Sequence, residues 1–297
     1  MGQRVNRKIT DLAEYQDLSH HDSALQLLPG ALEIDVGFVE FDDLVITMES
    51  SNLPLTVQPR ESDNITRIFI PGSAGEQRRW NGALIPMGSA ITSANWEGIF
   101  CNSPNQYDFE ITLSECLARE IGLQNAQESF VFNLSSMETL TPWLLDLIRH
   151  RKLTSTMHRE VTSTLSKLLE SSDTTTSHTI EMHRRYALVK RVMVYLTQIQ
   201  ANQMYLSAKD LCDEIGTTQR TLQRAFNDIL AVSPYQYLMS VRLQSAYRWM
   251  QKKAHTTSVT EVGERFGFAS SSSFIGHYQS FFGETPAATL RRYKKQG

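Results

Sequence analysis

The stretch LCDEIGTTQRTLQRAF, residues 211–226, and the stretch VGERFGFASSSSF, residues 262–274, follow one chemical pattern. Each begins with two apolar residues four positions apart, passes a glycine, and continues into a second apolar series with a spacing of four. The first copy comprises Leu211, Ile215, Gly216, Leu222, Phe226 and Leu230. The second comprises Val262, Phe266, Gly267, Phe274, Tyr278 and Phe282. Because residues at i and i+4 share a helix face, each copy predicts two short helices around a tight turn, the pattern of a helix-turn-helix unit.

Local signals support the ends of these helices. Gly216 follows the first short helix, where a left-handed backbone conformation costs glycine little. The hydroxyl of Thr218 can cap the next helix, and Ser258 can cap the first helix of the second copy. Ser233-Pro234 and Thr285-Pro286 are each expected to end one helix and begin another, since proline is tolerated in a first helical turn.

The segment between the two copies predicts one continuous helix over residues 235–253, because it contains neither glycine nor proline. A rigid helix here would fix the distance between the two units, so that they could enter successive major-groove segments about one helical turn apart. A generic helical repeat protein is the alternative, but repeat arrays usually need about three or more units for stability and this chain has two.

Charge divides the chain in the same way. Residues 180–297 contain 16 Lys and Arg against 8 Asp and Glu, a net charge of +8, whereas residues 1–179 contain 13 against 24, a net charge of −11. A basic module attracts the phosphate backbone and releases counterions, so its binding should weaken steeply with salt. With 297 residues, two domains are expected, and only the C-terminal one has the charge for nucleic acid.

Residues 186–297 resemble the DNA-binding domain of AraC/XylS-type bacterial transcription regulators. The motifs RTLQRAF, SP-x-x-YL-x-x-x-RL, GF and FG-x-TP occur in the order typical of that family. The resemblance implies that the first recognition helix contacts bases and phosphates through Thr218, Arg220, Thr221, Gln223 and Arg224. It also implies a regulator that binds double-stranded promoter DNA and most often activates transcription by recruiting RNA polymerase.

The second recognition helix departs from the family pattern, because Gly276 stands where the family usually carries an arginine. The candidate contacts here are Ser270, Ser271, Ser272, Ser273 and His277. Serine lacks the bidentate contact of arginine with guanine, which is worth about 1–3 kcal/mol. The first unit is therefore expected to contribute most of the base recognition.

The N-terminal half predicts many short strands separated by turn residues. The stretches are Leu32–Phe41, Leu44–Met48, Leu53–Val57, Ile65–Ile70, Ala83–Pro86, Ile99–Asn102, Tyr107–Leu113 and Ser129–Leu134. Short strands of this kind favour a small barrel or a double-sheet jelly roll, and the region is similar to the cupin-type barrel of the same family. The expected fold is thus α+β and multidomain, with an acidic cupin-like β-barrel domain over residues 1–138.

This domain has no recognisable catalytic or metal-binding set. Residues 31–134 contain no histidine, and the chain shows no HExxH motif and no phosphate-binding glycine loop, so neither an enzyme nor a cofactor is expected. A small organic effector remains possible, with a candidate pocket lined by Trp80, Trp96, Phe100 and Tyr107. Arg78 and Arg79 could then anchor an anion, whereas a plain core role for the aromatic residues is the alternative.

Residues 139–169 predict a pair of helices, and the second carries an apolar stripe of Met157, Val161, Leu165 and Leu168. The stripe could pack on the barrel or form a homodimer contact, which the family resemblance favours. The polar run of residues 170–179 predicts a flexible linker. The all-α DNA-binding domain is then expected over 180–297, with helix-turn-helix units at about 207–230 and 258–282 joined by the linker helix.

Three separated cysteines (Cys101, Cys116 and Cys212) suit a reducing compartment. Because no apolar run reaches about 18 residues and residues 1–30 lack a signal-peptide core, neither a membrane span nor secretion is expected. These observations favour a cytoplasmic bacterial transcription regulator, with activation the leading hypothesis. Repression, or control by a protein partner instead of a small effector, is the alternative.

Overall fold

The computed structural model describes residues 3–19, 21–59, 65–72, 78–85, 89–94, 98–102, 104–123, 130–133, 137–150, 154, 156–170, 173–175, 180–199 and 206–295. The chain forms two compact units. Unit 1 comprises Met1–Ala24 and Glu33–Thr179, and unit 2 comprises Leu25–Leu32 and Ile180–Gly297. The division near residue 180 agrees with the division by charge, but the short N-terminal segment in unit 2 has no counterpart in the expected domain boundaries.

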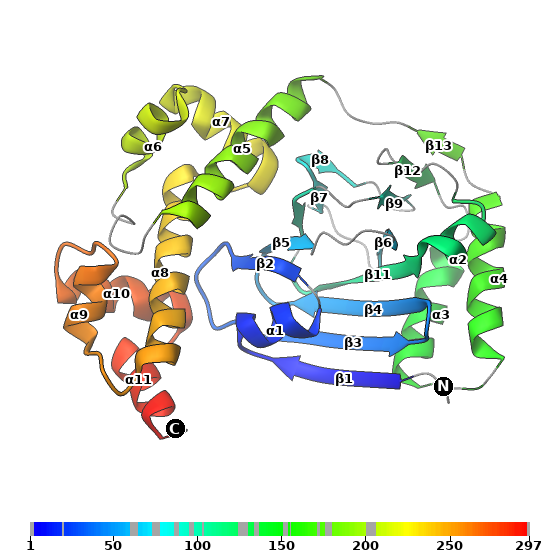
Figure 1. The fold of residues 1–297 in the computed structure, drawn as a ribbon, viewed down its shortest axis with the longest axis horizontal. Coiled ribbons are helices and arrows are strands. Elements are labelled where there is room, and N and C mark those ends of the chain that lie inside the picture. Colours follow the sequence, from blue (N-terminus) through cyan, green and yellow to red (C-terminus); the bar gives the residue numbers. More distant parts are fainter. Residues whose placement is uncertain are drawn as a thin grey trace. The chain divides into compact units, whose positions relative to one another are not determined.

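Unit 1 contains two β-sheets (Figure 1). The large sheet has the strand order β1 (Gln3–Ile9), β3 (Ile34–Glu40), β4 (Leu44–Ser51), β11 (Gln106–Ser114), β6 (Ile65–Pro71), β9 (Ser89–Ala94), β12 (Phe130–Asn133) and β13 (Asp173–Thr175). The small sheet has the order β2 (His21–Gln26), β5 (Leu55–Pro59), β10 (Phe100–Cys101), β7 (Arg79–Trp80) and β8 (Ala83–Leu84). Neighbouring strands of the large sheet run antiparallel. Among the described strands, neither sheet closes on itself, so the β-rich region expected as a barrel is a pair of open sheets.

Alternation along the strands determines which face of the large sheet is buried. In β4 the alternate residues Leu44, Ile46 and Met48 are buried, and in β11 the side chains of Phe109, Ile111 and Leu113 have no exposed surface. Successive side chains of a strand point to opposite faces. One face of the sheet therefore presents a continuous apolar surface that another layer must cover.

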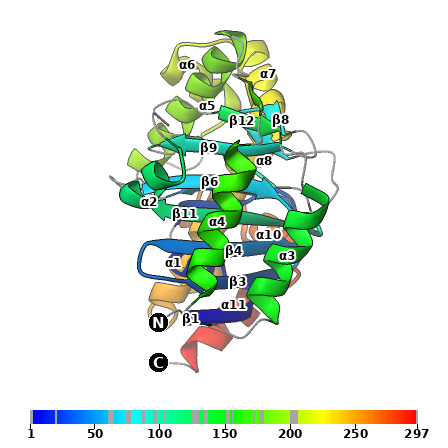
Figure 2. The same ribbon diagram turned by 90° about the vertical axis from the view of Figure 1, so that its right-hand side faces the viewer.

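Two helices provide that layer, α3 (Met137–Arg149) and α4 (Met157–Glu170), which lie across the large sheet in Figure 2. One hydrophobic core joins the sheet residues to α3 and to the α4 stripe, Met157, Val161, Leu165 and Leu168. These four side chains are at most 9% exposed. Of the two roles open to the stripe, packing on the sheet within one chain is the one that the structure describes, and a homodimer contact remains a prediction.

Several elements of unit 1 lie outside the stretches that the sequence predicts as strands. They include β1, β2, β9, the helix α1 (Leu12–Leu18) and the helix α2 (Glu115–Glu120). Asp11 caps α1 by accepting hydrogen bonds from two backbone amides, and Ser114 caps α2. The expectation of a flexible linker over 170–179 is wrong for residues 173–175, which form β13 and pair with β12.

Unit 2 is helical apart from its N-terminal segment. Its helices are α5 (Ile180–Gln198), α6 (Ala208–Ile215), α7 (Gln219–Leu230), α8 (Pro234–Lys253), α9 (Val259–Arg265), α10 (Ser271–Phe282) and α11 (Pro286–Lys294). Within this unit, α8 connects the pair α6–α7 to the pair α9–α10 (Figure 1). The two expected helix-turn-helix units and the linker helix are thus present.

The buried position of the α4 stripe yields a prediction that differs from that for a dimer contact. Val161→Asp should destabilise unit 1 by more than about 3 kcal/mol, because it places an unpaired charge in the core. Thermal unfolding measures the effect, and Ser163→Asp on the exposed side of the same helix is the matched control. A soluble, fully folded monomer of the Val161 variant would contradict the core assignment.

Candidate nucleic-acid interface

The turn of the first helix-turn-helix unit is built from a glycine between two capped helices. Ser207 and Asp210 form a capping box at the start of α6. Gly216 ends that helix with φ 70° and ψ 50°, a left-handed conformation that glycine adopts without steric penalty. Thr218 then accepts a hydrogen bond from the backbone N–H of Thr221 and starts α7. These contacts determine where the recognition helix begins and hence which of its side chains face outward.

Helix α7 has a fully buried face and a polar exposed face. Leu222, Phe226 and Leu230 are at most 1% exposed. The candidate contacts Thr218, Arg220, Thr221, Gln223 and Arg224 are all exposed. The structure therefore brings the five candidates of the first unit together at the N-terminal end and outer face of one helix, which is the part of a recognition helix that meets base edges.

Several arginines of unit 2 are committed to internal contacts. Arg185 Nη1 lies 2.5 Å from Asp228 Oδ2, and Arg191 Nη2 donates to the Ile215 carbonyl oxygen at 2.8 Å. The guanidinium of Arg265 stacks 3.8 Å from the centre of the Trp249 ring. Arg292 pairs with Glu284. These side chains contribute to the charge excess of unit 2 but stabilise its fold.

Arg220 and Arg224 differ from those residues. Within the part of the chain that the structure describes, neither has a hydrogen bond or ion pair to another residue. Gln223, which lies between them, bonds only locally along α7, where its Nε2 donates to Asn227 Oδ1 at 3.0 Å. Two exposed guanidinium groups on adjacent turns are thus available for an external acceptor, and guanine and phosphate are the acceptors that arginine binds best.

The second unit repeats the backbone design with other side chains. Gly267 has φ 72°, and Ser270 caps α10 by accepting a hydrogen bond from the Ser273 backbone N–H. The candidates Ser270, Ser272 and His277 are exposed. Ser271 and Ser273 are half-buried, and the Ser271 hydroxyl donates to Thr260 Oγ1 at 3.4 Å. The structure therefore places three of the five candidates openly on the outer side of α10.

Close packing behind α10 depends on another glycine. A Cβ atom at Gly263 in α9 would lie 3.2 Å from the Cβ atom of Phe274, which is tighter than ordinary van der Waals contact. Gly276, on the outer face, has open space where a Cβ atom would stand. The two glycines consequently have different roles. Gly263 allows α9 and α10 to approach closely, whereas Gly276 leaves the outer face of α10 without a side chain at that position.

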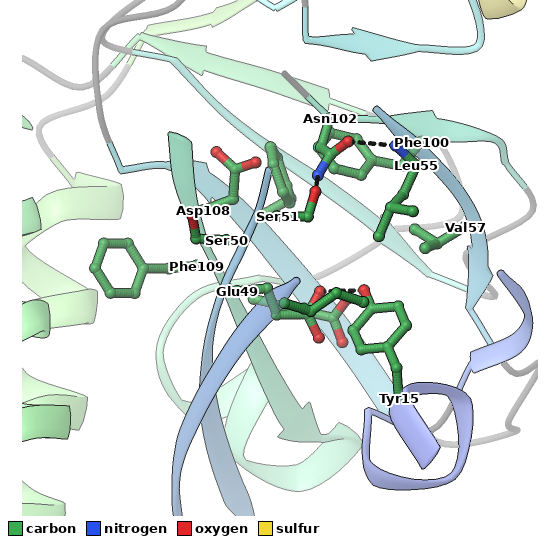
Figure 3. A pocket seen from close by; sticks show the side chains of 13 residues that line it. Tyr15, Glu49, Ser50, Ser51, Leu55, Val57, Phe100, Asn102, Asp108 and Phe109 are labelled. Carbon is green, nitrogen blue, oxygen red and sulfur yellow. Dashed lines mark hydrogen bonds between the residues drawn. The ribbon is translucent and has the colours of Figure 1, made fainter. Parts of the chain in front are cut away.

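Unit 1 contains a small pocket that is partly open to solvent (Figure 3). Its described lining includes the carboxylates Glu49, Asp108 and Glu110, and no Lys or Arg. Glu49 Oε2 accepts a hydrogen bond from the Tyr15 hydroxyl at 2.6 Å. Burial raises the pKa of Asp108 to about 7, although the neighbouring Arg78 guanidinium acts in the opposite direction. Asp108 and Glu110 are ion-paired with the buried residues Arg78 and Arg67, so the pocket combines apolar walls with carboxylates of which two are partly neutralised.

The cavity differs from the pocket expected from the aromatic residues. Phe100 lines it, whereas Trp80 is buried and Tyr107 packs edge-on against Phe109, and neither belongs to the lining. Trp96 lies outside the described residues. Arg78, a possible anion anchor, instead bonds Asp108. The signal that sequence reasoning missed is the pair of acidic residues at alternate positions of β11, Asp108 and Glu110.

The described residues show no cluster of His, Cys, Asp or Glu that could hold a metal ion. None of the helices in the described part of the chain is both long and apolar enough to cross a membrane.

Comparisons with known proteins match the helical unit. Residues 211–292 match a family model described as a helix-turn-helix domain. The chain is 30% identical over 90 residues to the probable thc operon regulatory protein of Rhodococcus erythropolis, which covers 30% of this chain and 27% of that protein. It is 27% identical over 132 residues to the XylDLEGF operon transcriptional activator of Pseudomonas putida, which covers 44% and 40%. The matches thus span less than half the length of these relatives.

Two solved structures are similar over the same region. The transcriptional regulator from Chromobacterium violaceum, described with AraC-type DNA-binding domain-containing proteins, has 26% identity and a TM-score of 0.32, covering 36% of this chain and 96% of that one. The DNA-binding domain of AdpA in complex with a target DNA has 26% identity and a TM-score of 0.32, covering 36% and 93%.

The two glycines of the second unit give opposite predictions. Gly276→Ala should stabilise unit 2 by about 0.5–1 kcal/mol, because the position is helical and open. Gly263→Ala should destabilise it, because the new Cβ atom presses on Phe274. Chemical denaturation of both variants measures the difference, and a gain in stability at both positions would contradict the packing described.

Proposed function

We propose that this chain is a sequence-specific transcription regulator that binds duplex promoter DNA through both helix-turn-helix units. The match of residues 211–292 to a helix-turn-helix domain and the resemblance to AraC/XylS-type regulators support this proposal. The observation that carries the proposal is that Arg220 and Arg224 are both exposed on the outer face of α7 and have no described internal partner, whereas Arg185 and Arg265 of the same unit bind within it. Such a regulator would act on chromosomal DNA in the bacterial cytoplasm.

The length of α8 supports simultaneous binding by both units. This helix has 20 residues, and at 1.5 Å per residue it is about 30 Å long. Successive major-groove segments on one face of B-DNA are about 34–36 Å apart. A continuous helix of this length between two recognition helices suits one DNA site with two adjacent segments.

Activation is the direction of regulation that we favour. The relative from Pseudomonas putida is named as a transcriptional activator, and the resemblance to the AraC/XylS family implies recruitment of RNA polymerase. Repression by the same DNA-binding unit is the alternative. A promoter fusion assayed with and without the chain separates the two, since transcription would rise in the first case and fall in the second.

Selection of bound sequences from random duplex DNA at two salt concentrations tests the proposal directly. We expect one enriched motif that spans two major-groove segments, and binding that weakens steeply as salt rises because phosphate contacts release counterions. Enrichment of a single segment would remove the second unit from base recognition. Absence of any enriched motif would contradict sequence-specific binding.

The two recognition helices should contribute unequally. Arg224→Ala should relax specificity at one position of the first segment and cost about 1–3 kcal/mol of binding, the value of a bidentate contact with guanine. Ser272→Ala and His277→Ala should each cost less, because neither side chain can make that contact. Quantitative binding to the selected site and its single-base variants measures all three. Equal losses would reject the asymmetry.

A second function is favoured by the cavity of unit 1, which we propose binds a small organic cation with an apolar portion. Phe69, Phe100 and Val57 provide apolar walls, and Glu49 supplies a carboxylate at the same wall as Tyr15. Glu49 is half-buried, and a partly desolvated carboxylate attracts a cationic partner and disfavours an anion. Control by a protein partner is the alternative for the regulatory signal.

Thermal unfolding in the presence of amines and of carboxylic acids with the same apolar portion distinguishes a cationic effector from a protein partner. A bound amine should raise the melting temperature by mass action, equivalent to about 2.7 kcal/mol at a concentration of 100 Kd. Glu49→Gln should abolish the effect, and Glu33→Gln at an exposed position should not. Stabilisation by the acids alone would contradict a cation site, and stabilisation by neither would favour a protein partner.

A further inference from the structure

A segment from the N-terminal part of the sequence belongs to the DNA-binding unit. Leu25–Leu32 groups with Ile180–Gly297, although the chain on either side of it belongs to unit 1. The segment includes the last two residues of β2 and the turn that precedes β3. Its side chains Gln26 and Leu27 are 1% and 2% exposed. Connecting segments usually run over the protein surface, so this burial indicates that the segment packs against other elements.

The first half of this contact is with helix α8. The backbone N–H of Gln26 donates to Gln244 Oε1 at 3.2 Å, and Gln244 Nε2 donates in return to the Gln26 carbonyl oxygen at 3.1 Å. The Ser240 hydroxyl, one turn earlier on α8, donates to the Leu27 carbonyl oxygen at 3.3 Å. Gln244 is only 3% exposed. Side chains on one face of α8 thus bind the backbone N–H and C=O groups of the segment, as the backbone of a neighbouring strand would.

The second half is with the C-terminal end of α10, the second recognition helix. The last carbonyl groups of a helix have no partner within the helix. Here the Phe281 carbonyl oxygen accepts a hydrogen bond from the Gly30 backbone N–H at 2.8 Å and another from Gln26 Nε2 at 3.3 Å. Gly30 has φ 142°, a conformation that L side chains rarely adopt. The segment therefore caps α10 with a backbone shape that requires glycine.

The side chain of Gln26 also shapes the segment itself. Its Nε2 donates to the carbonyl oxygens of Leu28 and Gly30 at 2.8 and 2.9 Å. One buried amide thereby folds the turn and joins it to α10. Buried polar groups of this kind are costly when they lose a partner, because the group left behind has no water to replace it. Undocking would expose several such groups at once on the segment, α8 and α10.

We propose that Leu25–Leu32 helps to hold the second recognition helix in position on α8, so that the second helix-turn-helix unit binds DNA most tightly while this segment is docked. Gln26 and Gln244 are positioning residues in this arrangement and do not touch DNA. The inference rests on the proposed DNA binding for its functional consequence and on geometry for the docking itself.

Full-length variants test the two parts separately. Gln244→Met keeps the size of the side chain and removes its bonds to the segment. Gln251→Met on the same helix is the matched control, because the Gln251 amide donates to the Tyr293 hydroxyl and not to the segment. Leu27→Ala changes only the segment, and it replaces Gln244→Met if that variant fails to fold.

Hydrogen exchange followed by mass spectrometry measures docking without DNA. In the wild-type protein, peptides covering residues 25–32 and the end of α10 should be protected. Gln244→Met should accelerate exchange in both of these regions, whereas Gln251→Met should accelerate exchange in neither. Unprotected wild-type peptides, or equal exchange in the two variants, would overturn the docking inference.

Binding to two duplexes measures the functional part. One duplex carries both segments of the selected site, and a shorter one ends before the second segment. Gln244→Met should bind the long duplex more weakly by about tenfold or more, as the loss of its two buried bonds to the segment predicts, and should bind the short duplex like wild type. Equal losses on both duplexes, or none, would overturn positioning by the segment. A wild-type protein that binds neither duplex would instead contradict the proposed function and leave the exchange result valid.

Discussion

The arrangement of the helical unit depends on helix α8 being anchored in a hydrophobic core near each of its ends. Near its start, the Tyr237 ring packs edge-on against Phe226 of α7, with 5.2 Å between ring centres. Further along, Leu243, Ala246 and Met250 enter the core that contains Phe274 and Tyr278. A helix anchored in two hydrophobic cores cannot rotate in one of them without disturbing the other. The two recognition helices are therefore parts of one rigid arrangement and not two independently tethered modules.

Polar groups complete this arrangement around the second core. The Tyr278 hydroxyl lies 2.9 Å from Thr289 Oγ1, and burial raises the pKa of this tyrosine. The Thr289 hydroxyl in turn donates to Glu284, which accepts two hydrogen bonds from Arg292. Glu284 and Arg292 thus stabilise the contact between α10 and α11. The outer face of each recognition helix carries other polar side chains. The net charge of the unit does not distinguish arginines that stabilise the fold from arginines that are exposed on a recognition helix.

The predictable features were those determined by short stretches of sequence. The glycine turns at Gly216 and Gly267, the caps at Ser233 and Thr285, and the apolar stripes of α7 and α10 were all evident, because each depends on neighbours within a few residues. The strand β13 was not, since Asp173–Thr175 pairs through backbone hydrogen bonds that leave no apolar pattern. The acidic cavity and the docked segment were also missed, because both join residues far apart in sequence.

The discontinuity of unit 2 has a consequence for how the protein is made. The segment Leu25–Leu32 leaves the ribosome well before Phe281, its partner at the end of α10. Translation proceeds at about 5–20 residues per second, so the segment waits roughly ten to fifty seconds for that partner. During this interval its buried glutamine and leucines have no native binding surface. The order of synthesis therefore makes completion of the DNA-binding unit one of the last events in the folding of the whole chain, after both ends of the segment have been drawn into the sheets.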